Sequence, residues 1–98
     1  MAIDPTILNK VKTKLRISHN ALDDDVADTI TACLKDLEVC GVQASNPDDP
    51  LILNAIKLYC RAEFTDDTDK AADYMTRYDA LKSCLMMASG YREATGDE

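Results

Sequence analysis

Apolar side chains recur every three or four residues through four stretches of this chain, and this spacing restricts its fold more than any other feature. At about 100° per residue, such spacing gathers the apolar groups on one face of a helix. The four stretches are 4–16, 21–40, 50–64 and 68–88. The sequence therefore predicts an all-α fold with one small domain of about four helices over residues 1–98, in which 89–98 form a C-terminal tail.

Capping residues mark most of the expected helix ends. Two Asp-Pro pairs, at residues 4–5 and 49–50, combine a favoured N-cap residue with a favoured first helical residue. Asn20 is expected to cap the second helix. Gly41 and Gly90 are expected to end the second and fourth helices, because glycine readily adopts the left-handed conformation that closes a helix.

The apolar faces indicate how these helices pack. The third expected helix is apolar around much of its circumference, so we expect it to be the central helix of the domain. The first helix is short and basic, and its apolar stripe consists of Ile7, Leu8, Val11 and Leu15. The stripe of the second helix consists of Leu22, Val26, Ile30, Cys33, Leu34 and Leu37. The stripe of the fourth consists of Ala71, Tyr74 or Met75, Tyr78, Leu81, Leu85 and Ala88.

The end of the fourth helix is continuously apolar. Leu85, Met86, Met87 and Ala88 cannot all face one core, so either they fill a wide end of the core or part of this segment contacts another molecule. Under the second interpretation, the residues expected to contact a partner protein or a neighbouring subunit are Leu85, Met86, Met87, Tyr91 and Arg92.

The charge is acidic overall and unevenly distributed. Eleven Lys and Arg against eighteen Asp and Glu give a net charge of -7, which disfavours a nucleic-acid-binding domain. Residues 1–20 nevertheless carry four basic side chains and one acidic one. The distribution indicates either a solvated surface or a subunit whose basic end docks on the acidic flank of a neighbour. The subunit-interface residues predicted under the second interpretation are Lys10, Lys12, Lys14, Arg16, Asp23, Asp24 and Asp25.

Neither export nor membrane insertion is indicated by the sequence. Residues 1–5 lack a basic leader and an apolar core, and no apolar run approaches the length of a membrane span. None of the four cysteines forms a C-x-x-C pair, so we expect buried, reduced thiols rather than disulfides or a zinc site. These cysteines are Cys33, Cys40, Cys60 and Cys84.

The residues needed for catalysis or cofactor binding are not found. His19 is the single histidine, and its neighbour Ser18 does not by itself provide triad geometry, so a turn-capping or surface role is expected for it. The acidic clusters at 23–25, 48–49 and 66–69 lack the Gly and Glu of a calcium loop, and each lies where a helix is expected to begin. With no glycine-rich phosphate loop either, we predict no enzymatic activity, no metal and no cofactor.

Several short motifs of the chain are similar to those of a known family. Residues 11–18 (VKTKLRIS) followed by the acidic turn 23–25 resemble the start of the head–tail connector (adaptor) proteins of tailed bacteriophages, in which a short helix ends in Leu-Arg-Ile or Leu-Arg-Val. Residues 48–52 (DDPLI), residues 78–82 (YDALK) with Leu85, and the closing 90–92 (GYR) are also similar to that family.

The resemblance implies a specific structural role. Members of that family, some of them labelled DNA-packaging proteins, are small all-α subunits that form a ring of about a dozen copies. The ring docks on the portal of the DNA-filled capsid, receives the stopper or tail-completion protein, and lets DNA pass without specific binding. The expected location is therefore the virion neck, after synthesis in the bacterial host cytoplasm.

Two other functions remain open from the sequence. A small helical interaction or regulatory protein, dimeric or monomeric and without a phage role, is compatible with the same helices. A small DNA-binding protein that uses the basic first helix is a further alternative, which would require binding that weakens with salt.

Overall fold

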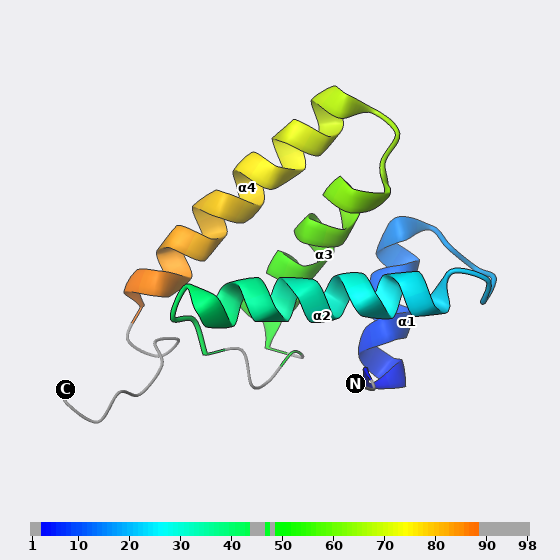
Figure 1. The fold of residues 1–98 in the computed structure, drawn as a ribbon, viewed down its shortest axis with the longest axis horizontal. Coiled ribbons are helices and arrows are strands. Elements are labelled where there is room, and N and C mark those ends of the chain that lie inside the picture. The colour runs from blue at the N-terminus through cyan, green and yellow to red at the C-terminus, as the bar shows by residue number, and fades with distance from the viewer. Residues whose placement is uncertain (1–2, 44–46, 48, 89–98) are drawn as a thin grey trace.

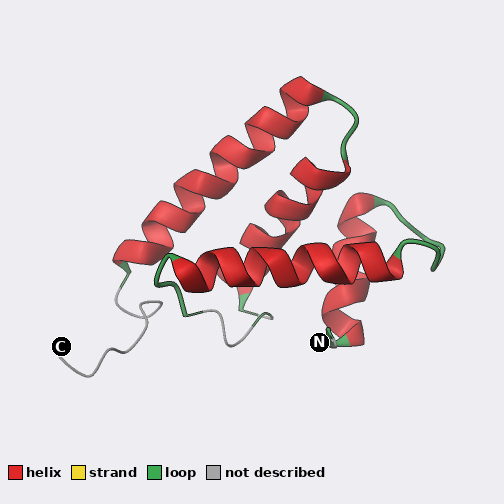
Figure 2. Ribbon diagram, in the orientation of Figure 1, coloured by secondary structure: helices red, strands yellow, loops and turns green. Residues whose placement is uncertain are grey.

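A computed structural model describes residues 3–43, 47 and 49–88 of the chain, and every regular element in this part is a helix. The helices are α1 (Pro5–Leu15), α2 (Asp23–Val39), α3 (Pro50–Phe64) and α4 (Thr68–Met87) (Figures 1 and 2). The predicted all-α fold of four helices is therefore confirmed.

Aspartates cap three of the four helices. The side-chain Oδ1 of Asp4, Asp49 and Asp67 accepts a hydrogen bond from the amide two residues later, at 2.7, 3.0 and 2.9 Å respectively. These bonds satisfy amides that have no partner inside the helix. The predicted Asp-Pro starts of α1 and α3 are confirmed.

The start of α2 differs from the prediction. The helix begins at Asp23, with Leu22 in the N-cap position and no side-chain cap. Asn20 lies too early in the chain to cap it, and its Oδ1 instead accepts a hydrogen bond from Lys12 Nζ at 3.0 Å. The prediction that Asn20 caps α2 was therefore wrong. Instead, the three aspartates in the first turn stabilise this end of α2 through their interaction with the helix dipole.

Two residues with positive φ close α1 and α2. Gly41, at φ 87°, follows α2 as predicted. Arg16 occupies the equivalent position after α1 at φ 61°, and Ile17 N donates to Lys12 O at 2.9 Å across that turn. The fourth helix ends at Met87, one residue earlier than predicted. The role predicted for Gly90 falls outside the described residues.

The helices form a layer of three that is crossed by α2. In Figure 1, α3 lies between α1 and α4, and α2 runs across one side of this layer. Helix α3 contacts each of the other three helices, which confirms its predicted central place. Among the described residues, no helix is long and apolar enough to cross a membrane.

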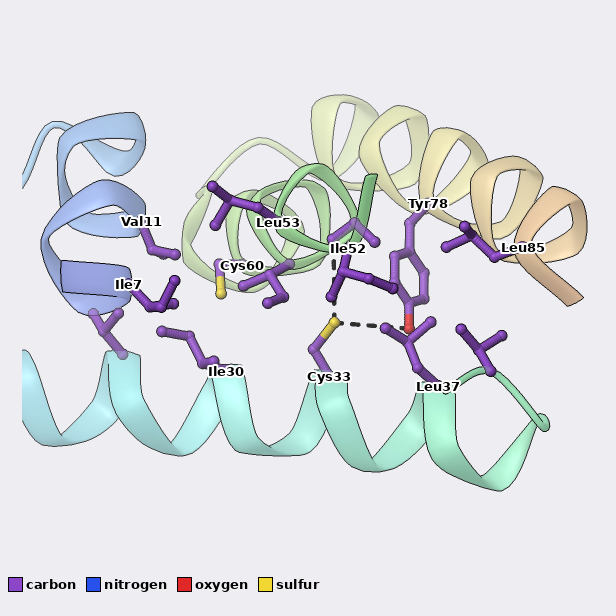
Figure 3. Packing of buried hydrophobic residues seen from close by; sticks show 14 residues of the cluster. Ile7, Val11, Ile30, Cys33, Leu37, Ile52, Leu53, Cys60, Tyr78 and Leu85 are labelled. Carbon is purple, nitrogen blue, oxygen red and sulfur yellow. Dashed lines mark hydrogen bonds between the residues drawn. The ribbon is translucent and has the colours of Figure 1, made fainter. Parts of the chain in front are cut away.

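The core fills the space between α2 and the other three helices (Figure 3). Ile7 and Val11 of α1 meet Ile30 of α2 at one end, and Tyr78 and Leu85 of α4 lie near Leu37 at the other. The buried residues shared among the helices are Ile7, Val11, Val26, Ile30, Cys33, Leu37, Ile52, Leu53, Ala55, Ile56, Cys60, Tyr78 and Leu85.

The cysteines divide into two kinds. Cys33 and Cys60 are buried, and burial raises the pKa of each thiol to about 12, so both stay protonated. Cys40 is half-buried and Cys84 is exposed. The prediction of four buried thiols was therefore wrong for these two. Cys40 follows the last residue of α2, and Cys84 lies on the side of α4 that faces away from the core.

Candidate functional site

A basic groove runs along the surface that α1, α3 and α4 share. One hollow of about 320 Å³ lies between all three helices, and two neighbouring hollows of about 250 and 520 Å³ lie between α1 and α3. Six of the eleven basic side chains of the protein line these hollows, and in the described part of the chain no Asp or Glu lines them. We call this surface the basic groove; its six residues are Lys10, Lys14, Arg16, Lys57, Arg61 and Arg77.

The geometry of α3 places the groove on the side of the layer away from α2. Ala55 and Ile56 are fully buried, and the carbonyl of Ala55 approaches Cys33 Sγ of α2 at 4.0 Å. At about 100° per residue, Lys57 and Arg61 lie on the opposite side of α3. The groove and α2 are thus presented on different faces of the molecule.

Two arginines of the groove are held in place by α4. Arg61 Nη2 donates to Tyr74 Oη at 2.6 Å, and its guanidinium lies 4.4 Å from the centre of that ring. Arg77 Nη2 pairs with Asp73 Oδ2 at 3.1 Å. These contacts restrict the rotamers of both arginines, so less conformational entropy is lost when a partner binds.

Other basic groups of the groove have no such contact. Within residues 3–43, 47 and 49–88, no hydrogen bond or ion pair engages the charged ends of Lys14, Arg16 or Lys57. Lys14 and Arg16 are exposed, whereas Lys57 is half-buried. These three groups therefore offer positive charge that the described part of the chain does not neutralise.

The walls of the groove also contain apolar groups. Leu58 and Leu81 line the hollow between α1, α3 and α4, and Leu51 and Leu53 line the one next to Pro50. Leu51 keeps 43 % of its surface exposed. A ligand that fits this surface combines negative charge with apolar surface.

The sequence-predicted interface residues are placed in two different settings. Lys10, Lys14 and Arg16 line the basic groove. Lys12 is buried at 6 % exposure, and its Nζ lies 2.6 Å from Asp23 Oδ1 in the same chain. This ion pair ties α1 to the start of α2, so both residues contribute to the fold of one subunit.

The residues that sequence reasoning missed come from α3 and α4. Lys57 and Arg61 are spaced by four on one face of α3, as Lys10 and Lys14 are on α1. That repeated spacing was the available signal. Arg77 had no comparable signal, because only the packing of α4 on α3 brings it to the groove.

Three exposed carboxylates lie near the start of α2, on the other face of the molecule. Asp24 and Asp25 belong to its first turn, and Asp28 lies one turn further on. In the described part of the chain, no hydrogen bond or ion pair engages these three carboxylates. We call Asp24, Asp25 and Asp28 the acidic end of α2.

A second polar cluster joins α4 to α2 inside the fold. Tyr78 is fully buried, and its hydroxyl donates to Asp36 Oδ2 at 2.6 Å. Lys82 Nζ donates to the same oxygen at 3.0 Å. Burial acts to raise the pKa of Asp36, but these two hydrogen bonds and the charge of Lys82 outweigh it and lower that pKa. Burial, and then the hydrogen bond to Asp36, raise the pKa of Tyr78, so the phenol remains a donor.

The single histidine does not belong to any of these clusters. His19 is exposed, and its Nδ1 accepts a hydrogen bond from the amide of Ala21 at 3.2 Å. The expected surface hydrogen-bonding role is confirmed. Among the described residues, no group of three or more His, Cys, Asp or Glu side chains is placed to hold a metal ion.

The apolar end of α4 is only partly in the core. Leu85 is buried at 1 % exposure, whereas Met86 and Met87 keep 42 % and 81 % of their surface exposed. The inference that this segment cannot all face one core is confirmed. Tyr91 and Arg92, predicted to contact a partner together with these residues, lie outside the described residues.

Comparison with known families identifies the chain. The model of the phage connector protein family matches residues 7–92, from within α1 to beyond the end of α4. The chain belongs to the phage connector protein family. This is a family of structural proteins rather than enzymes, and it agrees with the resemblance to head–tail connectors seen in the sequence. No curated protein and no solved structure gives a significant match.

Proposed function

We propose that this connector protein is a structural subunit of the head–tail connector of a phage or prophage. Copies of it form a ring of about a dozen subunits that docks on the portal of the DNA-filled capsid. The ring then receives the stopper or tail-completion protein, and its place is the neck of the virion. The observation that carries this proposal is the family match over residues 7–92, which includes nearly all of the helical fold.

The separation of charge supports a ring. The basic groove and the acidic end of α2 lie on different faces, so a contact between them is heterologous. In such an arrangement every subunit uses one surface of each kind. The assembly closes into a ring when the rotations between successive neighbours add up to a full turn.

The end of the molecule where α2 and α4 terminate supports a contact with the portal or a neighbouring subunit. Val39, Met86 and Met87 expose 74 %, 42 % and 81 % of their surfaces there, and both helix ends lie at the same side of Figure 1. The flexible methionine side chain adapts to varied apolar surfaces. We include Tyr91 and Arg92 in this contact. Leu85 is buried and packs α4 against the core, so it is not part of the contact surface.

The net charge supports passage of DNA without binding. Each subunit carries -7, so a ring is strongly acidic. An acidic channel wall repels phosphates and lets the duplex slide.

The docking proposal can be tested with portal particles from the same phage. Electron microscopy of portals mixed with the protein is expected to show a ring of added density on the portal. The double variant Met86→Gln and Met87→Gln should weaken this attachment. The matched control, Ala72→Gln and Thr76→Gln, changes exposed positions nearer the other end of α4 and should attach normally. Portals that remain bare with the unmodified protein would exclude the connector role.

A further inference from the structure

The basic groove has the character of a receptor for an acidic helix. Lys57 and Arg61 are half-buried and line the hollow between α1, α3 and α4. Leu58 and Leu81 line the same hollow. A partner that fits this hollow complements it best with carboxylates for the charges and a slender apolar surface for the leucines.

The acidic end of α2 offers this combination. Asp24, Asp25 and Asp28 are exposed and unengaged by the described part of their own chain. Ala32, one turn after Asp28, is exposed, and Ala27 is half-buried. Small side chains beside the carboxylates let the backbone of a helix approach a groove closely.

Three exposed aspartates in and beside α4 are less available. Asp67 caps the helix, Asp73 pairs with Arg77, and Asp79 lies 3.8 Å from Lys82 Nζ. Contacts within the chain thus already stabilise these three carboxylates, whereas the described part of the chain engages none of the three that lie together at the acidic end of α2.

We infer that the basic groove of one copy of this chain binds the acidic end of α2 of a second copy. This inference rests on the proposed ring and names its subunit contact. Lys14 and Lys57 meet Asp24 and Asp28 of the neighbour, while Arg61 and Arg77 are held in position by α4. Lys12 and Asp23 take no part, because they pair within one subunit.

The charge balance favours a second copy over DNA as the occupant. Six of the eleven basic side chains lie in the groove, so the remainder of the protein carries eighteen acidic groups against five basic ones. A DNA duplex in the groove would bring further phosphates within a Debye length, about 10 Å, of that acidic surface, which would repel them. A second copy instead brings a short acidic helix end and no long anionic polymer.

Charge reversal provides the test. A groove variant carries Lys14→Glu and Lys57→Glu, and an acidic-end variant carries Asp24→Lys and Asp28→Lys. Self-association is measured by sedimentation at up to about 1 mM protein and about 20 mM salt, where charge interactions are screened least. We expect each variant alone to associate at least about tenfold more weakly than the unmodified protein.

Complementation distinguishes a direct contact from misfolding. An equimolar mixture of the two variants, or one chain with all four changes, again pairs opposite charges and should recover association. A control for the groove variant carries Lys35→Glu and Lys70→Glu. It changes the net charge by the same amount as the groove variant, but at exposed positions outside the groove, and it should associate normally. Circular dichroism confirms that each variant is folded.

Several results would overturn the inference. One is that the unmodified protein fails to self-associate under these conditions, and another is that the two variants associate as strongly as the unmodified protein. The third such result is association that is lost in each variant and not recovered in their mixture. Salt-sensitive binding of a short DNA duplex that the groove variant abolishes would assign the groove to DNA instead. None of these outcomes bears on portal docking, which electron microscopy reports separately, so failure of the contact and failure of the connector role are distinguishable.

Discussion

Removal of one buried hydroxyl, in Tyr78→Phe, tests how α4 is held on α2. The ring of Tyr78 is fully buried, and its hydroxyl donates to Asp36 Oδ2 at 2.6 Å. The thiol of Cys33 lies 3.8 Å from the same hydroxyl. Phenylalanine keeps the ring and its packing, so the substitution isolates the polar contact.

The expected loss follows from the nature of the acceptor. A hydrogen bond to a charged group contributes about 1.5–3 kcal/mol to stability. Asp36 keeps its bond to Lys82 and has 36 % of its side chain exposed, so water replaces part of the lost contact. We therefore expect the free energy of unfolding to fall by about 1.5–2 kcal/mol. For a domain of this size, that lowers Tm by roughly 10 °C.

Tyr59→Phe is the matched control. Tyr59 is half-buried and packs edge-on against Tyr78, with ring centroids 5.2 Å apart. In the described part of the chain, its hydroxyl forms no hydrogen bond. Urea denaturation with an unchanged m value should show a loss for Tyr78→Phe and little for Tyr59→Phe. Equal losses in the two variants would refute the assignment of this energy to the Asp36 contact.

The same contact predicts a dependence on pH. Because the pKa of Asp36 is lowered in the folded protein, its contribution to stability is fully present above its unfolded pKa, about 3.9. That contribution is lost as the pH falls through the lower folded pKa. The difference between the unmodified protein and Tyr78→Phe should therefore shrink under strongly acidic conditions, as urea midpoints at several pH values would reveal. A difference that stays constant down to about pH 2 would contradict the charged acceptor.

Three further substitutions test other parts of the structure. Asp49→Ala removes the cap of α3 and should reduce the free energy of unfolding, measured in urea, by about 1 kcal/mol; no change would mean that the cap bonds are replaced by water. Ile56→Ala opens a cavity in the fully buried core and should cost about 2–5 kcal/mol in the same assay, whereas a loss below about 1 kcal/mol would contradict that burial. Arg16→Gly removes the strain of a left-handed arginine and should raise the free energy of unfolding by up to about 1 kcal/mol, so a fall in Tm would contradict it. The same change removes a charge of the basic groove and should weaken self-association, which unchanged sedimentation would contradict.

The positions of the helices followed from local chemistry in the sequence. The Asp-Pro pair at 49–50 and the apolar run after it specify the start and the central place of α3 without reference to the rest of the chain. Gly41 ends α2 because the turn needs positive φ, which glycine adopts without strain. The left-handed Arg16 was not predictable in this way, because arginine has no such preference.

The surfaces, by contrast, depend on how the helices pack. The sequence showed a basic first helix but not that Lys10 and Lys14 share a groove with Lys57 and Arg61, more than forty residues later. It also could not separate Lys12 from its basic neighbours. Spacing along one helix shows which side is apolar, but not which other helix covers a given side chain.

The sequence by itself determined an acidic protein of four helices, because caps, periodicity and charge are properties of contiguous residues, and its short motifs resembled those of connector proteins. Only the tertiary structure decided which of the basic residues lie together. It buried Lys12 against Asp23 and placed Lys14 and Lys57 in one groove on the face away from α2. The physical reason is that a groove is formed between helices, so its residues are selected by packing contacts that span the whole chain.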